Sequence, residues 1–303
     1  MTEDINDSGL RPGVERRLEF IEYRLYWEGG VNRADITEKF GVSQPQASND
    51  LTLYQRLAPE NLRYDTSLKR YLPAAGFRPI FLKPNAAQYL VEQKSLAEHV
   101  LSPADSWSGE APPVGVMPVP GRRVKPEILQ SLLRAIRAGR ALRVHYHSMS
   151  EERPDAIWRW ITPHALGCDG LRWHVRAYCH VRERFLDFVL SRFLETAEFG
   201  DPGALPVSDV DWNSFFEVVL KPNPKLGPAK MRTVALDYEM VDGKLVLSVR
   251  RALLYYLDKR LRLDVGEKLD KPHETPIVVA NRAEFEKAIK EATGAVVPVE
   301  GEQ

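Results

Sequence analysis

Residues 32–58 read NRADITEKFGVSQPQASNDLTLYQRLA, and this stretch decides the fold of the first part of the chain. Asn32 is a favourable helix cap, and Gly41 supplies the left-handed residue that ends a short helix. Ser43 and Gln46 have the pattern of a capping box, so a second helix starts there and continues to about residue 57. The spacing therefore predicts two helices joined by a tight turn.

Helical and hairpin patterns flank this pair of helices. An amphipathic helix with Pro12 in its first turn precedes the pair and ends at Gly29-Gly30. Behind the pair, residues 62–64 and 70–72 flank a polar turn, which predicts a β-hairpin. Three helices followed by a hairpin is the order of a winged helix-turn-helix domain.

The second helix of the pair presents a face of amides and hydroxyls. In a helix-turn-helix this helix enters the DNA major groove, where Gln and Asn pair with adenine and Ser and Thr both donate and accept. A solvated face would more often carry Glu and Lys, although an interaction module on the same frame is the alternative. We expect Gln46 and Asn49 to set the sequence preference. The predicted base-reading residues are Ser43, Gln44, Gln46, Ser48, Asn49 and Thr52.

Net charge in the first 75 residues is −2, from ten basic and twelve acidic residues, which is low for a DNA-binding domain. Four cations at the hairpin and the end of the second helix are expected to contact phosphates beside the site. They are Arg56, Arg63, Lys69 and Arg70. Protection of an exposed strand edge would explain the hairpin cations equally well. We expect few phosphate contacts per subunit, so two subunits are needed for useful affinity.

The composition of the 303 residues is that of a soluble globular protein, with 44% hydrophobic and 28% charged residues and a net charge of zero. The first seven residues are polar and acidic, so we expect no secretory signal, and no apolar run is long enough to cross a bilayer. Cys168 and Cys179 fit neither a zinc site nor a disulfide framework. We therefore expect a cytoplasmic protein with no membrane partner.

Stretches rich in proline and glycine divide the chain into four parts. We predict a winged helix-turn-helix domain over residues 1–75, a partly helical linker region over 76–123, a β-rich domain over 124–200 and a C-terminal domain over 201–303. The β-rich domain is expected to have a helix at 126–138 and strands at 142–148, 159–166, 171–179 and 184–194. For the C-terminal domain we predict a link at 201–228, a hairpin turned at Asp242-Gly243, a helix at 251–261, a strand at 277–280 and a helix at 282–292.

Positive charge concentrates in residues 121–200, which hold fourteen basic residues, nine acidic residues and five of the seven histidines. Arg176 and Arg192 lie in apolar strand-like runs, where a half-buried arginine requires an anionic partner. That partner is either an anionic ligand or an internal acid such as Asp187 or Glu195.

Two further positions in this region bear on a ligand cavity. Tyr146 and Ser148 continue the buried face of a strand with polar tips, which is a common cavity lining. Trp173 shares one face of its strand with apolar residues, and a tryptophan in that position is more often part of the core.

Four motifs of residues 121–200 resemble the WYL domain. They are Tyr146-His147-Ser148, RWITPH at 159–164, WHVRAY at 173–178 and FVLSRF at 188–193. The tripeptide that names the family, Trp-Tyr-Leu, is Trp173-His174-Val175 here. Together with the preceding winged helix and the following extension, the chain is similar to WYL-domain transcriptional regulators of the phage-defence repressor type, BrxR/CapW-like.

The resemblance implies an α+β multidomain fold with a winged helix-turn-helix, a central Sm-like β-barrel and a C-terminal α/β extension domain that joins two subunits. It implies a homodimer that binds a palindromic operator in double-stranded DNA, needs no cofactor, and responds to an anionic effector, a nucleotide or nucleic acid. By motif position, the residues that line or support the effector site are Tyr146, Ser148, His164, Trp173, Arg176 and Arg192.

Signatures of catalysis are missing from the sequence. It has no Walker phosphate loop, no Gly-x-Gly-x-x-Gly after a strand and no His-Glu-x-x-His, so we expect neither an enzyme nor a metal site. The rival hypothesis is a nucleotide- or RNA-processing enzyme that uses the winged helix for targeting. A third is a scaffold that binds another protein through the hairpin.

Overall fold

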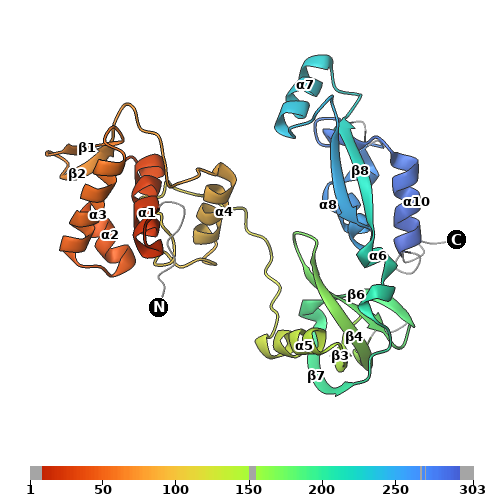
Figure 1. The fold of residues 1–303 in the computed structure, drawn as a ribbon. Coiled ribbons are helices and arrows are strands. Elements are labelled where there is room, and N and C mark those ends of the chain that lie inside the picture. Colours follow the sequence, from red (N-terminus) through yellow and green to blue (C-terminus); the bar gives the residue numbers. More distant parts are fainter. Residues whose placement is uncertain (1–8, 150–154, 267, 270, 294–303) are drawn as a thin grey trace. The chain divides into compact units, whose positions relative to one another are not determined.

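The computed structural model describes residues 9–149, 155–266, 268–269 and 271–293 (Figure 1). They belong to two compact units, Met1–Pro118 and Val119–Gln303. The first seven residues, where we expect no secretory signal, lie outside the described ranges. Within those ranges no helix has both the length and the apolarity that a membrane span requires.

Three helices followed by a hairpin form the first unit, as predicted. Its elements are α1 (Pro12–Glu28), α2 (Arg33–Phe40), α3 (Gln44–Leu57), β1 (Leu62–Asp65), β2 (Arg70–Pro73) and α4 (Ala86–Ala97). Gly29 and Gly41 end α1 and α2 with φ of 70° and 64°. The capping box predicted at Ser43 is half formed, because Ser43 accepts from the backbone of Gln46 while the Gln46 side chain bonds elsewhere.

A buried carboxylate joins the core of this unit to the segment that follows the hairpin. The facing sides of α1, α2 and α3 bury apolar residues such as Leu18, Ile36 and Leu51. Glu22 of α1 is fully buried among them and accepts a hydrogen bond from the Tyr54 hydroxyl. It also accepts three backbone N–H bonds, from residues 80–82, at 2.7–2.8 Å. These bonds satisfy the charge and fix the chain between β2 and α4 against α1.

The second unit begins with a helix packed on an antiparallel sheet. Ile128, Leu132 and Ala135 of α5 share one core with the strands. The sheet has the order β6-β5-β4-β3-β7, with β6 and β7 as its edges. The elements are α5 (Pro126–Ala138), β3 (Ala141–Tyr146), β4 (Ile157–Cys168), β5 (Trp173–Cys179), β6 (Arg184–Val189) and β7 (Phe193–Gly200).

Two expectations for this sheet need revision. The pairings between described strands form an open sheet, so they do not confirm the closed Sm-like barrel. The single strand predicted over 184–194 is wrong, because a 3-10 turn at Leu190–Arg192 separates β6 from β7 and sends them to opposite edges of the sheet. A continuous apolar run concealed that turn in the sequence.

The remainder of the second unit is a small α+β layer built on the order β10-β8-β9. The hairpin predicted at Asp242-Gly243 is confirmed only at its turn, where Val241 and Lys244 form an isolated antiparallel bridge, because a helix and not a strand precedes it. The predicted link at 201–228 contains β8, the central strand. The elements are α6 (Val210–Asn213), β8 (Phe215–Pro222), α7 (Pro228–Asp237), β9 (Leu245–Arg250), α8 (Leu254–Arg260), α9 (Leu263–Gly266), β10 (Ile277–Val279) and α10 (Arg282–Thr293).

Candidate DNA interface and effector site

Helix α3 has one buried face and one exposed face, as its sequence predicts. Ala47, Leu51 and Tyr54 are buried against α1 and α2. The opposite face consists of residues that are exposed or half-buried. Ser43, Gln44, Asn49, Thr52 and Arg56 are exposed, and Gln46 and Ser48 are half-buried.

The polar side chains on this face differ in how free they are. Gln46 donates its amide to Asp50 at 2.9 Å, and buried Asp50 is also paired with Arg17 at 2.6 Å. The Thr52 hydroxyl donates to the backbone of its own helix. By contrast, the amides of Gln44 and Asn49 make no hydrogen bond with any described residue. Gln44 and Asn49 therefore present donors and acceptors that water or a base edge can satisfy.

The four predicted phosphate contacts also fall into two kinds. Arg56, Arg63 and Lys69 are exposed. Arg70 is half-buried and donates to the carbonyl of Gly30 at 2.7 Å, with Glu110 3.6 Å away. Its guanidinium thus holds the hairpin to the end of α1, which leaves it less free to reach a phosphate.

Arg176 in β5 forms an internal ion pair. Its side chain is bonded in a bidentate manner to Asp209, at 2.7 and 3.0 Å, and lies 3.4 Å from Asp187. Arg176 is 5% exposed and Asp209 is 1% exposed. Asp187 was among the expected internal partners. Asp209 was missed, because it lies in the segment predicted as a link and has no sequence pattern to mark it.

His164 joins the same acid, with its Nε2 atom 2.9 Å from Asp209. Burial alone would raise the pKa of Asp209. Hydrogen bonds from His164 and Arg176 outweigh it and lower that pKa to about 2. Asp209 also caps α6 by accepting from the backbone of Trp212. The chain leaving the sheet is therefore anchored to β4 and β5 through this one carboxylate.

His174, at the second position of the Trp-Tyr-Leu motif, belongs to a neighbouring network. It is buried, lies 3.2 Å from Asp169, and its ring is 4.8 Å from that of Tyr256 in α8. The Tyr256 hydroxyl donates to Asp187. Burial lowers the pKa of His174 and raises that of Asp187, although Arg176 opposes the latter shift. The substituted motif position thus contacts the C-terminal part of the unit.

Tyr146 and Arg192 lie together with a third residue, Arg159. Tyr146 is buried and accepts a hydrogen bond from the backbone of Val189. Burial raises the pKa of its hydroxyl, and the Val189 bond and the Arg192 guanidinium oppose that rise. The guanidinium of Arg159 lies 5.6 Å from the centre of the Tyr146 ring. Arg159 is 7% exposed, yet its Nε and Nη2 atoms have no hydrogen-bond partner among the described residues. Arg159 is two residues from Ile161 on β4, so both side chains lie on the inward face of the strand. This alternation was the sequence signal that could have identified Arg159.

Trp173 lines a surface pocket together with Val189, whose backbone donates to Tyr146. Trp173 is 56% exposed, which excludes the alternative that it belongs to the core. Arg122 and Ser191 also line this pocket, which has a volume of about 240 Å³ and lies at the start of β5. Ser148 is half-buried just beyond β3. The six predicted effector residues therefore do not form one constellation.

Metal ligands do not gather in the described part of the chain, where no three His, Cys, Asp or Glu side chains are grouped for an ion.

Three family models match consecutive parts of the chain. They describe the BrxR transcriptional regulator winged helix-turn-helix domain over residues 13–94, the WYL domain over 127–198, and the BrxR transcriptional regulator C-terminal dimerization domain over 215–285. This order of domains defines the class of winged-helix, WYL-domain transcriptional regulators.

Similar proteins of known name identify the family within that class. A protein of Stenotrophomonas maltophilia named DNA-binding transcriptional repressor CapW is 42% identical over 95% of this chain and 96% of its own length. Proteins of the same name from Pseudomonas aeruginosa and Escherichia coli are 39% and 38% identical, over 93% of this chain and 94% of theirs. The chain therefore belongs to the CapW family.

A solved structure, proteasome accessory factor B/C of Arthrobacter aurescens, is 18% identical and covers 96% of this chain and 51% of its own, with a TM-score of 0.22. That likeness is too weak to support an argument.

Proposed function

We propose that this protein is a DNA-binding transcriptional repressor that acts in the cytoplasm on a palindromic operator of a phage-defence operon. The observation that carries the proposal is the α3 face, where Gln44 and Asn49 are exposed with their amides unbonded to described residues while the opposite face packs in the core. Amides of this kind pair bidentately with adenine in the major groove. The names of the CapW relatives support the same function.

Dimerisation follows from the charges and from the C-terminal family match. Arg56, Arg63 and Lys69 are the exposed cations of this reading surface, and so few phosphate contacts give weak binding by one subunit. Two copies of α3 must lie about 34 Å apart, or a multiple of that, to read both halves of a palindrome. Residues 215–285, which match a dimerization domain, would join the subunits.

The effector site is proposed to centre on Arg159 and Arg192 beside Tyr146. A buried guanidinium with unbonded nitrogens needs an anion, and a nucleotide or nucleic-acid phosphate supplies one. Residues Ser148 and Trp173 would lie at its margins, and the sheet that carries them is proposed to be of the Sm-like type. Arg176 and His164 are already bonded to Asp209, so we assign them the role of holding β4 and β5 in position and not of binding the effector.

Regulation then depends on a difference in binding energy. An effector that prefers a subunit arrangement unsuited to the operator spacing lowers DNA affinity, typically by about 1–3 kcal/mol of coupling. The chain needs no catalytic step for this response.

Sequencing genomic fragments retained by the purified full-length protein tests the DNA-binding function. We expect a small set of fragments that share an inverted repeat. Random recovery, with no shared motif, would contradict sequence-specific binding.

The effector site is tested separately, on the recovered operator. Titration with mixed nucleotides and short oligonucleotides should release the wild-type protein from the operator. Arg159→Gln should bind the operator normally but need at least about a tenfold higher effector concentration for release. Arg143→Gln is the matched control, because Arg143 is paired with Glu198 at the surface. Equal responses of both variants would exclude Arg159 as an effector contact.

A further inference from the structure

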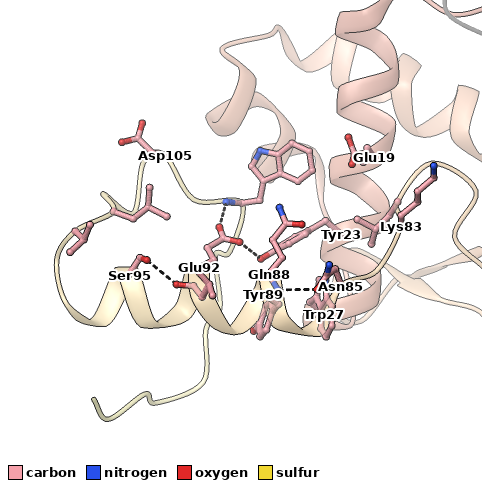
Figure 2. Close-up of a pocket in the computed structure, with 15 residues that line it drawn as sticks. Glu19, Tyr23, Trp27, Lys83, Asn85, Gln88, Tyr89, Glu92, Ser95 and Asp105 are labelled. Atoms are coloured by element: carbon pink, nitrogen blue, oxygen red, sulfur yellow. Dashed lines mark hydrogen bonds between the residues drawn. The ribbon is translucent and has the colours of Figure 1, made fainter. Parts of the chain in front are cut away.

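A cavity of about 550 Å³ lies between α1 and α4 in the first unit (Figure 2). Its volume is within the range of small-molecule sites. Glu19, Tyr23 and Trp27 line it from α1, and their spacing of four residues places them on one face of that helix. Tyr89 and Glu92 line it from α4. No residue of α3 contributes, so this cavity is separate from the proposed DNA interface.

Aromatic rings form much of its wall. Trp27 stacks on Tyr89 with ring centres 4.4 Å apart and planes at 14°. Trp107 meets Tyr23 edge-on, with ring centres 5.7 Å apart. Surfaces of this kind hold a flat apolar group, and their electron-rich faces attract a cation.

Carboxylates outnumber cations in the lining, with Glu19, Glu92 and Asp105 against Lys83. Figure 2 shows Glu92 bonded to the Tyr23 hydroxyl, and it also accepts from the backbone of Trp107. Glu19 differs, because it is half-buried and makes no hydrogen bond or salt bridge with a described residue. Burial raises its pKa, and Arg16 nearby offsets part of that rise. A carboxylate in this state is stabilised by any cation that enters the cavity.

We propose that this cavity binds a small organic cation that has an aromatic or apolar body. Its ammonium or guanidinium group lies beside Glu19, and its body lies against Tyr23 and the stacked pair of Trp27 and Tyr89. An anion is disfavoured by the excess of carboxylates. The site therefore takes the opposite charge class from the effector proposed for the second unit, and it stands whether or not that effector site is correct.

Calorimetric titration of the full-length protein with three probes of one body tests the proposal. The probes are 2-phenylethylammonium, 2-phenylethanol and 3-phenylpropanoate. We expect one ammonium bound per chain, at least about tenfold more tightly than the neutral or anionic probe. Glu19→Gln should weaken the ammonium by at least about fivefold and leave the alcohol unchanged.

Glu38→Gln is the matched control, because Glu38 is an exposed acid of α2 that does not line the cavity. Tyr89→Leu should weaken all three probes, and thermal unfolding of each variant should confirm that it folds. Equal affinities for the three probes would overturn the proposal. So would equal losses in Glu19→Gln and Glu38→Gln, or no saturable binding up to about 10 mM.

Discussion

The polar face of α3 and the network around Arg176 use polar side chains in opposite ways. On α3, Gln44 and Asn49 are exposed, and their amides are not bonded to described residues. Around Arg176, a guanidinium, an imidazole and two carboxylates are buried and bonded to one another. Polar groups left unsatisfied at the surface suit an external partner, whereas satisfied buried charges suit a structural joint. The position of a residue in a family motif does not show whether it binds an external partner or stabilises the fold. Its hydrogen bonds and ion pairs do show this.

The largest effect that this comparison predicts is on stability. Arg176→Ala should lower the free energy of unfolding of the second unit by about 3–5 kcal/mol, because it leaves Asp209 buried without its guanidinium. Urea unfolding followed by tryptophan fluorescence measures the loss. The exposed pair of Arg143 and Glu198 is the control, and Arg143→Ala should cost less than about 1 kcal/mol. If Arg176→Ala is as stable as this control, Arg176 is free to bind a ligand and the contrast disappears.

On α3 the corresponding change should affect recognition and not stability. Asn49→Ala should reduce operator affinity by about 1–3 kcal/mol per half-site, with the unfolding free energy within about 0.5 kcal/mol of the wild type. Competition gel shifts with specific and random DNA measure the loss. Gln46→Ala should reduce selectivity less, because Asp50 already holds the Gln46 amide. A larger loss of selectivity in Gln46→Ala would mean that Gln46 changes its partner on DNA.

Acid should weaken the buried network of Arg176, His164 and Asp209, because it protonates Asp209. The pKa of Asp209 in the folded protein, about 2, lies below the ordinary value of 3.8. The contribution of Asp209 to the free energy of unfolding is therefore fully present above pH 3.8 and is lost as the pH falls through 2. Protonated Asp209 resembles asparagine. The difference in unfolding free energy between the wild type and Asp209→Asn should therefore shrink by about 2 kcal/mol from pH 5 to pH 2. A difference that stays constant over this range would show that His164 and Arg176 do not stabilise the charged form.

The smallest effect should come from the hairpin. Lys69→Gln should weaken binding to all DNA sequences alike, by about 1 kcal/mol or less, and reduce the salt slope by about one per subunit. Measuring the dissociation constant at several salt concentrations provides the test. Lys83→Gln is the matched control, because Lys83 is an exposed lysine of the same unit that lies outside the hairpin. An unchanged salt slope in Lys69→Gln would assign Lys69 to protection of the strand edge.

The winged helix could be predicted because its signals are local. The cap at Asn32 and the glycines at 29 and 41 specify helix ends within a few residues. The ion pair of Arg176 and Asp209 joins residues 33 positions apart, and no periodic pattern marks Asp209. The turn at Asp242-Gly243 exists, but a local turn signal does not specify that a helix precedes it. Local signals therefore predicted α3 and its exposed polar face, whereas the pairing of Arg176 with Asp209 could not be predicted.

Glu22 determines how short an N-terminal fragment can be. Three of its hydrogen bonds come from the backbone of residues 80–82. A polypeptide cut at residue 75 would retain the helices and hairpin, yet lose the three backbone donors of Glu22 and the Phe77 and Phe81 side chains that pack on the core, so it should be less stable. Truncation experiments should therefore yield a folded product only when the C-terminal cut falls beyond Leu82.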